Sequence, residues 1–471
     1  MAAVGGWDAA AWRLARVDRR WRAPVAAVLL CDGAIDPAAL RARVAQRRAG
    51  LPVLRSRLVE SGRSGLPQRI DDDTPLAERV TARIVPDAGA DGIMVAADDL
   101  LERVLTDPGD PGPWGMCVVG SGPPIPAGPA RRYGGDGRKP CHGLIVWFNH
   151  ALTDAHGALQ TVLGLTDEGI SAQPDDDGAG RPGRGMQSDP LTWLPGLLAT
   201  GQQALRMLRD DPIAATQQAC ARADHWRILT GQRPPVSRPW PVGSAGSVRA
   251  TTVVPLAEIR EAVERLRSVG DEGRVRRLND LLIAAVTVSA WELTAGSATT
   301  VNVPIRLPSR AAGEAGNHLT AARLVLHPGT AGSPAQWCAD LAGEAAAQVH
   351  RWRTSVLPDV AEWLAAAGAV IPVGVLAQLA GGADLTVSNV RGPAAPVHLL
   401  GRRVVSVQPL VPPLGSGISV GLLTYAGQAR LGCAVHSGVG VDPGALLARA
   451  AAHLTGRAGA SAEPADDTPQ R

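Results

Sequence analysis

The sequence is poor in lysine and in aromatic side chains. Lys139 is the single lysine among 47 basic residues, and the 471 residues include only 12 Trp, 2 Tyr and 1 Phe. Basic and acidic residues nearly balance, so the formal net charge is +3 at pH 7. A nucleic-acid-binding protein needs a concentrated basic surface, which this balance does not indicate. We therefore expect no nucleic acid among the partners of the chain.

Long hydrophobic runs are also missing. A membrane-spanning helix needs a charge-free apolar run of about 18 residues, and the sequence has none. Met1 is not followed by the basic stretch and compact apolar segment of a secretory signal. The sequence therefore predicts a cytoplasmic protein. Two apolar segments, residues 191–208 and 364–379, are candidates for peripheral contact with a membrane or a lipid droplet, although core helices have the same pattern.

Closely spaced cysteines and nucleotide-binding loops are absent too. The six cysteines are scattered, and no two have the CxxC spacing of a zinc or redox site. The sequence has neither a Walker-type phosphate loop nor a strand-linked GxGxxG. We expect reduced core cysteines, no metal site and no permanently bound cofactor.

The chain is rich in hydrophobic residues that can form a folded core. Hydrophobic residues make up 45% of it, enough for one large core or two medium ones without disulfides. Two stretches rich in polar residues and proline, residues 174–188 and 231–246, interrupt the hydrophobic sequence. The predicted division is an N-terminal half at residues 1–185, a linker with a crossover helix at 186–246, a C-terminal half at 247–456 and a disordered tail at 457–471.

Helices and strands alternate along both halves. In the first half we predict strands at residues 25–30, 116–119 and 143–148, and helices at 98–105 and after the capping residues Asp36 and Asp154. In the second half we predict helices at residues 256–266, 279–293, 334–352 and 443–454, and strands at 300–305, 321–326, 385–388, 404–407, 418–423 and 429–435. The last two strands flank a short turn and predict an antiparallel hairpin. The pattern indicates an α/β (α+β) fold with mixed sheets rather than a doubly wound parallel sheet.

The strongest local motif is FNHALTDAHG at residues 148–157. His150 follows the most apolar predicted strand and precedes a helix, so rigid elements on both sides would hold its ring. A neutral imidazole accepts a proton from a hydroxyl, amine or thiol near neutral pH and returns it to a leaving group. His150 is therefore a candidate general base. The alternative is a helix-entry histidine without a chemical role.

Three further interpretations concern Asp154, a possible metal site and a serine motif. Asp154 either caps the following helix or pairs with an arginine. A metal site of His150, Asp154 and His156 is a weaker alternative because the spacing matches no zinc pattern. Residues 417–421 match the GxSxG elbow of serine hydrolases, but the alternating apolar residues around Ser419 predict a strand rather than the required strand-to-helix turn.

The segment around His150 resembles the HHxxxDG motif of the condensation and chloramphenicol-acetyltransferase-like superfamily, with Asn149 in place of the first histidine and Ala155 in place of the glycine. From about Gly6 to Leu454 the chain is similar to the bacterial wax ester synthase/diacylglycerol acyltransferase family. The segments that carry this similarity, in chain order, are Gly6-Trp7-Asp8 to Trp12, Cys31-Asp32-Gly33, Pro113-Trp114 (PLW), Asn279-Asp280 (ND), Gly316-Asn317 (GN), residues 388–393 (SNVPGP) and the hairpin at 415–425.

The resemblance implies two chloramphenicol-acetyltransferase-like halves with an active-site tunnel at their junction. Acyl-CoA would enter as a co-substrate from one side and an alcohol acceptor from the other. In this scheme His150 is the catalytic base. The residues implied to support the site are Asn149, Asp154, Asn279 and Asp280, and those implied to line the tunnel are Trp114, Ser388 and Asn389.

The function that the resemblance implies is ester formation by an acyl-CoA-dependent O-acyltransferase of the wax ester or triacylglycerol type, acting on a long-chain alcohol or a diacylglycerol. One alternative is an acyltransferase or condensation-type enzyme of specialised metabolism. Such an enzyme would acylate a hydroxyl or an amine from CoA or from an acyl carrier protein. A second alternative is a non-catalytic relative that binds acyl chains or a carrier protein.

Overall fold

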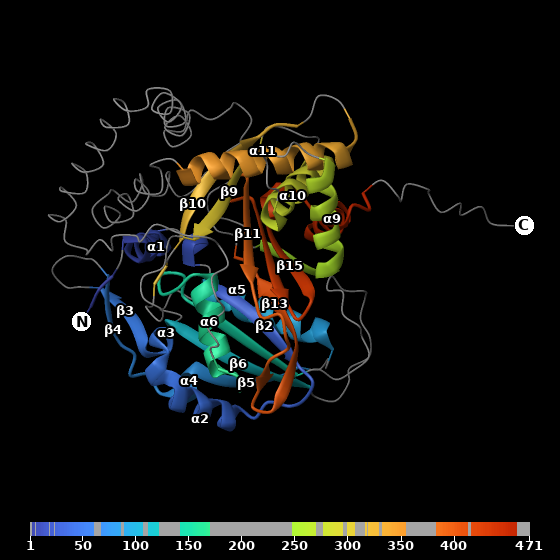
Figure 1. Cartoon of the computed structure of the whole chain (residues 1–471). Coiled ribbons are helices and arrows are strands. Elements are labelled where there is room, and N and C mark those ends of the chain that lie inside the picture. Colours follow the sequence, from blue (N-terminus) through green and yellow to red (C-terminus); the bar gives the residue numbers. More distant parts are fainter. Residues whose placement is uncertain are drawn as a thin grey trace, which may run out of the picture.

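The computed structural model describes residues 2–4, 6–17, 19–22, 24–60, 67–85, 89–106, 112–121, 142–169, 247–269, 277–294, 299–306, 316–317, 319–328, 332–354, 383–412 and 416–458. The described residues form two six-stranded sheets and one three-stranded sheet, with helices against both large sheets (Figure 1). The predicted fold class, a mixed α/β fold with mixed sheets, is confirmed. The segments 191–208 and 364–379 and residues 459–471 of the predicted tail lie outside the described residues.

The N-terminal sheet has the strand order β12-β13-β2-β7-β6-β5. Its strands are β2 (Val25–Cys31), β5 (Val80–Val85), β6 (Trp114–Ser121), β7 (His142–Phe148), β12 (His398–Leu399) and β13 (Arg402–Leu410). Apolar side chains of α2 (Pro37–Arg47) and α6 (Ala155–Leu165) pack on one face, and those of α5 (Ala90–Thr106) pack on the other. The strand β7 lies inside the sheet and is buried from Gly143 to Phe148, as its continuous apolar sequence predicted.

Two strands of this sheet come from the distant C-terminal part of the chain. Antiparallel pairing joins β13 to β2, with Val407 opposite Leu29. In Figure 1 the orange-red β13 accordingly lies beside the blue β2. The predicted C-terminal half, residues 247–456, therefore supplies strands to both large sheets. The strand β13 also packs closely against a strand of the second large sheet, because a Cβ atom at Gly432 in that strand would collide with the carbonyl oxygen of Pro409 in β13.

The C-terminal sheet has the order β10-β9-β11-β14-β15-β8. Its strands are β8 (Ser247–Pro255), β9 (Thr299–Arg306), β10 (Leu319–Leu326), β11 (Leu385–Arg391), β14 (Ile418–Tyr425) and β15 (Gln428–His436). The strands β9, β11 and β14 are parallel, and the predicted hairpin β14-β15 is antiparallel. The helices that pack on one face, forming the largest core, are α9 (Leu256–Val269), α10 (Leu278–Thr294), α11 (Pro334–Thr354) and α14 (Pro443–Thr455).

The two faces of the C-terminal sheet differ in chemistry. Side chains alternate along a strand, and the apolar Leu385 and Val387 point into the helix-covered core. The opposite face carries Thr386, which pairs with Asn302 and Ser419 across the sheet. Arg249 of β8 lies in the same row across the sheet. Its Nη1 atom is 3.5 Å from Oδ1 of Asp98 in α5, so this polar face is turned toward the N-terminal half.

Several elements were not predicted. They are the helix α1 (Gly6–Val17), the three-stranded sheet of β1 (Ala2–Ala3), β4 (Pro67–Asp71) and β3 (Ser56–Glu60), and the strands β5, β8 and β12. Short helical turns also occur, namely α3 (Pro52–Arg55), α4 (Leu76–Arg79), η1 (Arg19–Arg22), η2 (Arg48–Gly50) and η4 (Ser437–Val439). The helix α5 begins earlier than the predicted residue 98. Among the described residues, no helix combines the length and the apolar character needed to cross a membrane.

Candidate active site

His150 lies in the turn between β7 and α6, where the sequence placed it. The strand ends at Phe148, the helix begins at Ala155, and the His150 side chain is half-buried. The turn is anchored by Leu152, which is fully buried against the N-terminal elements. The ring is therefore held at the end of a buried strand without being sealed in the core.

Asn149 stabilises this turn through its own side chain. Its Oδ1 accepts a hydrogen bond from the backbone N–H of Ala151 at 2.9 Å, the pattern of an Asx turn. Its backbone N–H donates to the carbonyl oxygen of Pro113 at 2.8 Å, and its own carbonyl accepts from Leu152 at 2.9 Å. An asparagine at this position can therefore fix the backbone on the N-terminal side of His150.

Asp154 fixes the other side of the turn by capping α6. Its Oδ1 accepts from the backbone N–H of Gly157 at 2.8 Å. Of the two roles left open for Asp154, the structure thus contains the cap. Ala155 is the first helical residue, and the described non-glycine residues with positive φ do not include it. The backbone at this position therefore does not require a glycine. Gly157 is constrained instead, because a Cβ atom there would collide with Oγ1 of Thr153.

The His150 ring contacts a residue from the C-terminal half. Nδ1 of His150 lies 3.2 Å from Oδ1 of Asn317, and Nδ2 of Asn317 donates to the His150 carbonyl oxygen at 2.6 Å. Asn317 lies just before the start of β10, a strand of the C-terminal sheet. One amide side chain therefore holds both the ring and the backbone of His150.

Asn317 is held in turn by a buried carboxylate of α1. Oδ1 of Asp8 accepts from the backbone N–H and from Nδ2 of Asn317, both at 2.8 Å. The other oxygen, Oδ2, accepts from the guanidinium of Arg69 in β4 at 3.2 Å. Burial lowers the pKa of Arg69 from its usual value, and the attraction of Asp8 opposes that shift. We call these linked residues, Arg69, Asp8, Asn317 and His150, the Asp8–Asn317 array.

Gly316 lets Asn317 approach Asp8. Its φ of +143° lies in a region that side-chain-bearing residues rarely adopt, and a Cβ atom there would lie 3.0 Å from Oδ2 of Asp8. The Gly-Asn pair is thus a local requirement of the array.

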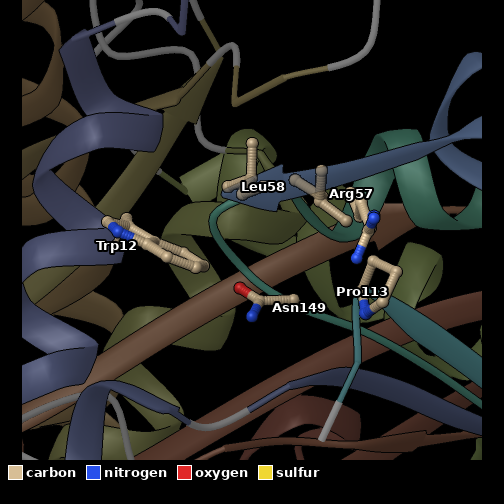
Figure 2. Close-up of a pocket in the computed structure, with 6 residues that line it drawn as sticks. Trp12, Arg57, Leu58, Pro113 and Asn149 are labelled. Atoms are coloured by element: carbon tan, nitrogen blue, oxygen red, sulfur yellow. The ribbon is translucent and has the colours of Figure 1, made fainter. Parts of the chain in front are cut away.

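A small pocket opens beside the turn. It has a volume of about 190 Å³ including its open mouth, and its lining residues are Trp12, Arg57, Leu58, Pro113, Asn149 and Leu152 (Figure 2). Figure 2 shows the Trp12 ring extending from α1 toward Asn149. Within the described part of the chain, Nε of Arg57 is buried and has no hydrogen-bond partner. The pocket therefore places one side of the His150 turn next to open space.

Comparison with known proteins identifies part of the chain. Residues 316–456 match the family model described as the WS/DGAT C-terminal domain. This part of the chain is therefore similar to that domain, and the name WS/DGAT C-terminal domain refers below to the matched residues 316–456. These residues include Asn317, β10 to β15 and α14, so the resemblance drawn from the sequence is confirmed here. No curated protein matches the chain.

Two solved structures of similar fold are condensation domains. One is a mutant starter condensation domain of rhizomide synthetase RzmA in complex with C8-CoA and Leu-SNAC, with TM-score 0.59, 16% identity, and coverage of 98% of this chain and 95% of that chain. Another is the first condensation domain of the calcium-dependent antibiotic synthetase with substrate analogue 3a, with TM-score 0.60, 16% identity, and coverage of 96% and 95%. At these identities the likeness shows the fold, and it covers nearly the whole chain.

Two predicted support residues lie outside the WS/DGAT C-terminal domain, at the start of α10. Oδ2 of Asp280 accepts from the backbone N–H of Arg277 at 2.8 Å, which fixes the start of the helix. Burial raises the pKa of Asp280, and this hydrogen bond opposes the shift. Asn279 beside it is half-buried. The helix packs on the face of the C-terminal sheet that is turned away from the N-terminal half, and no hydrogen bond between described residues joins Asn279 or Asp280 to His150.

The three predicted tunnel residues have different environments. Trp114 is fully buried in the core of the N-terminal sheet, and its indole N–H donates to the Leu54 carbonyl at 3.1 Å. Ser388 and Asn389 lie on β11 within the WS/DGAT C-terminal domain, half-buried and exposed respectively. Ser388 is on the polar face, where a Cβ atom at Gly421 would lie 3.3 Å from its Oγ.

The other motifs singled out in the sequence lie as follows. Ser419 is fully buried within β14, so the GxSxG match is part of a strand, as expected. Within the described ranges no group of three or more His, Cys, Asp or Glu is arranged to hold a metal ion. The described cysteines, Cys31, Cys117, Cys338 and Cys433, are buried, and burial raises the pKa of Cys338 to about 12.

Proposed function

We propose that the chain is an acyl-CoA-dependent O-acyltransferase in which His150 is the general base. The observation that carries the proposal is the half-buried His150 ring, which is held through Nδ1 by a residue of the WS/DGAT C-terminal domain. The condensation-domain fold supports an acyltransferase-type reaction. The solved neighbour in complex with C8-CoA supports acyl-CoA as the co-substrate.

In the proposed reaction Nε2 of His150 takes the proton from the acceptor hydroxyl as its oxygen attacks the thioester carbonyl carbon. The tetrahedral intermediate collapses by breaking the carbon–sulfur bond. The protonated imidazole then returns the proton to the departing thiolate, so the products are an ester and free CoA. A positioned base of this kind contributes roughly 10²–10⁴-fold, and holding both substrates in one site adds the larger entropic gain.

The other site residues have supporting roles in this proposal. Asn149 and Asp154 fix the two ends of the His150 turn through the hydrogen bonds described above. Ser388 and Asn389 are proposed as tunnel residues on β11, whereas the burial of Trp114 favours a core role next to the tunnel. Asp280 and Asn279 would act indirectly, by fixing α10 beneath the C-terminal sheet.

The acceptor could be a long-chain alcohol or a diacylglycerol, as in wax ester and triacylglycerol synthesis. The polar face of the C-terminal sheet favours a second candidate, acylation of a polar hydroxyl or amine from CoA or a carrier protein. One row across that face contains Arg323, Asn302, Thr386, Ser419 and Arg249. The Oγ1 atom of Thr386 is buried and has no hydrogen-bond partner among the residues that the structure describes. Such groups fit a polar substrate better than an alkyl chain.

An acceptor screen tests both candidates and the non-catalytic alternative. The purified chain is incubated with medium- and long-chain acyl-CoA and with hexadecanol, a diacylglycerol, a polar alcohol or an amino-acid thioester. Thiol release and product mass are measured. Ester formation supports the O-acyltransferase, and an amide product would instead assign the condensation-type reaction. Absence of thiol release above the protein-free rate with every acceptor would refute catalysis by this chain.

Peripheral membrane or lipid-droplet contact and the division into halves at residues 185 and 247 remain predictions. Flotation with liposomes tests the first, because a protein that contacts lipid rises with the vesicles. Limited proteolysis tests the second, since cleavage within residues 186–246 that leaves two associated fragments is expected for a linker.

A further inference from the structure

The orientation of the Asn317 amide is determined by its partners. Its Nδ2 faces the Asp8 carboxylate and the His150 carbonyl oxygen, and both of these groups only accept hydrogen bonds. The nitrogen of the amide must therefore occupy that position. Consequently, the atom that faces Nδ1 of His150 is the amide oxygen.

This orientation selects one tautomer of the neutral imidazole. An amide oxygen accepts but does not donate, so Nδ1 of His150 must carry the proton. The lone pair is then on Nε2, the nitrogen on the far side of the ring. A base that must remove a proton from an incoming substrate needs this free lone pair.

The Asp8 carboxylate adds charge to this geometry. Asp8 is 4% exposed and holds Asn317 by two hydrogen bonds. A positive charge that forms on His150 is thus separated by two hydrogen bonds from the buried Asp8 carboxylate. Because this carboxylate is shielded from water, it stabilises that positive charge more than it would in water. Arg69 of β4 faces the second Asp8 oxygen and partly offsets the carboxylate charge.

We propose that Asn317 and Asp8 are positioning residues that fix the Nδ1-protonated tautomer of His150, so that the lone pair of Nε2 is free to accept the substrate proton. The inference rests on the proposed function for its kinetic consequences and on geometry alone for the tautomer. Asp8 comes from α1 and Asn317 from the WS/DGAT C-terminal domain. The base is therefore complete only when these two distant segments meet.

The tautomer is measured without any turnover. The chain contains 10 histidines, so ¹⁵N-histidine NMR spectra of the wild type and His150→Gln are compared to assign the His150 ring. We expect Nδ1 protonation in the neutral ring of the wild type and a mixture of tautomers in Asn317→Ala. Nε2 protonation in the wild type would overturn the inference.

The kinetic consequence is measured with Asp8→Asn, because the amide oxygen can still accept both hydrogen bonds from Asn317, whereas the negative charge and the acceptor for Arg69 are removed. We expect kcat to fall with little change in KM, because the buried carboxylate charge no longer faces the positive charge that forms on His150 during the reaction. Asn317→Ala should lower kcat by about 10–100-fold with little change in KM, the typical cost of removing such a partner.

Asp167→Asn is the matched control. Its carboxylate pairs with Arg43 at 2.8 Å and lies after the end of α6 that is remote from His150. An unchanged kcat in Asp8→Asn, or an equal fall of kcat in Asp167→Asn, contradicts the proposal. If the wild type transfers no acyl group while NMR gives the expected tautomers, the proposed function fails and the positioning role remains.

Discussion

At the scale of single residues, the site depends on short side chains that bind backbone groups. Asn149 and Asp154 each hold one end of the turn that carries His150, through hydrogen bonds of 2.9 and 2.8 Å. Gly157 and Gly316 provide the space that this turn and the Asp8–Asn317 array need. Adding one methyl group at either glycine is therefore expected to shift the position of the His150 ring.

Gly316→Ala tests this dependence on space. The substitution forces a side chain onto a φ of +143° and toward Oδ2 of Asp8. We expect a loss of about 1–3 kcal/mol in unfolding free energy together with a drop in kcat. Denaturant unfolding and steady-state kinetics provide the measurements. Gly50→Ala is the control, since nothing lies within 4 Å of a Cβ atom there, and equal effects in both variants would contradict the account.

The pH dependence of stability tests a second buried residue. The side chains of Thr74 and Arg79 hold the pKa of Asp72 below its usual 3.8, against the effect of burial. A carboxyl group with a lowered folded-state pKa stabilises the fold above the unfolded pKa, and this contribution is lost as the pH falls through the folded value.

Asp72→Asn should therefore lower the unfolding free energy at pH 7 by about 3–5 kcal/mol, the cost of breaking a buried ion pair. The difference from the wild type should shrink below pH 3.8. Denaturant titrations at a series of pH values measure it. A difference that stays constant down to the acid limit would show that the Asp72 charge is not the cause.

At the scale of elements, strong hydrophobic patterns were predictable and weak ones were not. The strand β7 and the helices α2 and α6 followed from an apolar run and from the capping residues Asp36 and Asp154. The strands β3 and β4, with sequences SRLVE and PQRID, contain many charges and few buried positions, so they lack a clear alternation. Their pairing with each other is what makes them strands.

The candidate site was predictable in part for the same reason. His150 was identifiable because its neighbours in sequence are the strand and helix that hold it. Asp8 and Asn317 were noted only as parts of motifs that resemble a family, since nothing local connects residues 309 positions apart. The contact between them arises from tertiary packing of α1 against the C-terminal half.

At the scale of the whole molecule, the two halves are joined because the C-terminal half supplies two strands to the N-terminal sheet. The strand β13 completes the N-terminal sheet and crosses β15 closely at Gly432. A division of the chain at residue 247 therefore leaves the N-terminal sheet without β12 and β13. The chain thus links the two sheets covalently through β13, and the His150 turn at the end of β7 reaches the C-terminal half through Asn317.

Gly432→Ala tests the crossing. The added methyl group collides with the backbone oxygen of Pro409, which cannot rotate away as a side chain would. We expect a loss of about 1–3 kcal/mol in unfolding free energy, the usual cost of overpacking, measured by denaturant unfolding. Gly120→Ala in β6 is the control because the nearest atom to its Cβ would be 4.0 Å away. Equal stability of the Gly432 variant and the wild type would argue against a close crossing.

The central claim is that the His150 imidazole performs the proton transfers of acyl transfer. The most direct measurement is the rate of CoA thiol release by His150→Ala, with the acceptor that the wild type uses and with circular dichroism to verify the fold. His398→Ala, which removes an exposed imidazole paired with Glu168, is the matched control. The account predicts a fall of at least about 10²-fold for His150→Ala and a rate close to wild type for His398→Ala. A folded His150→Ala protein that retains the wild-type rate would contradict it.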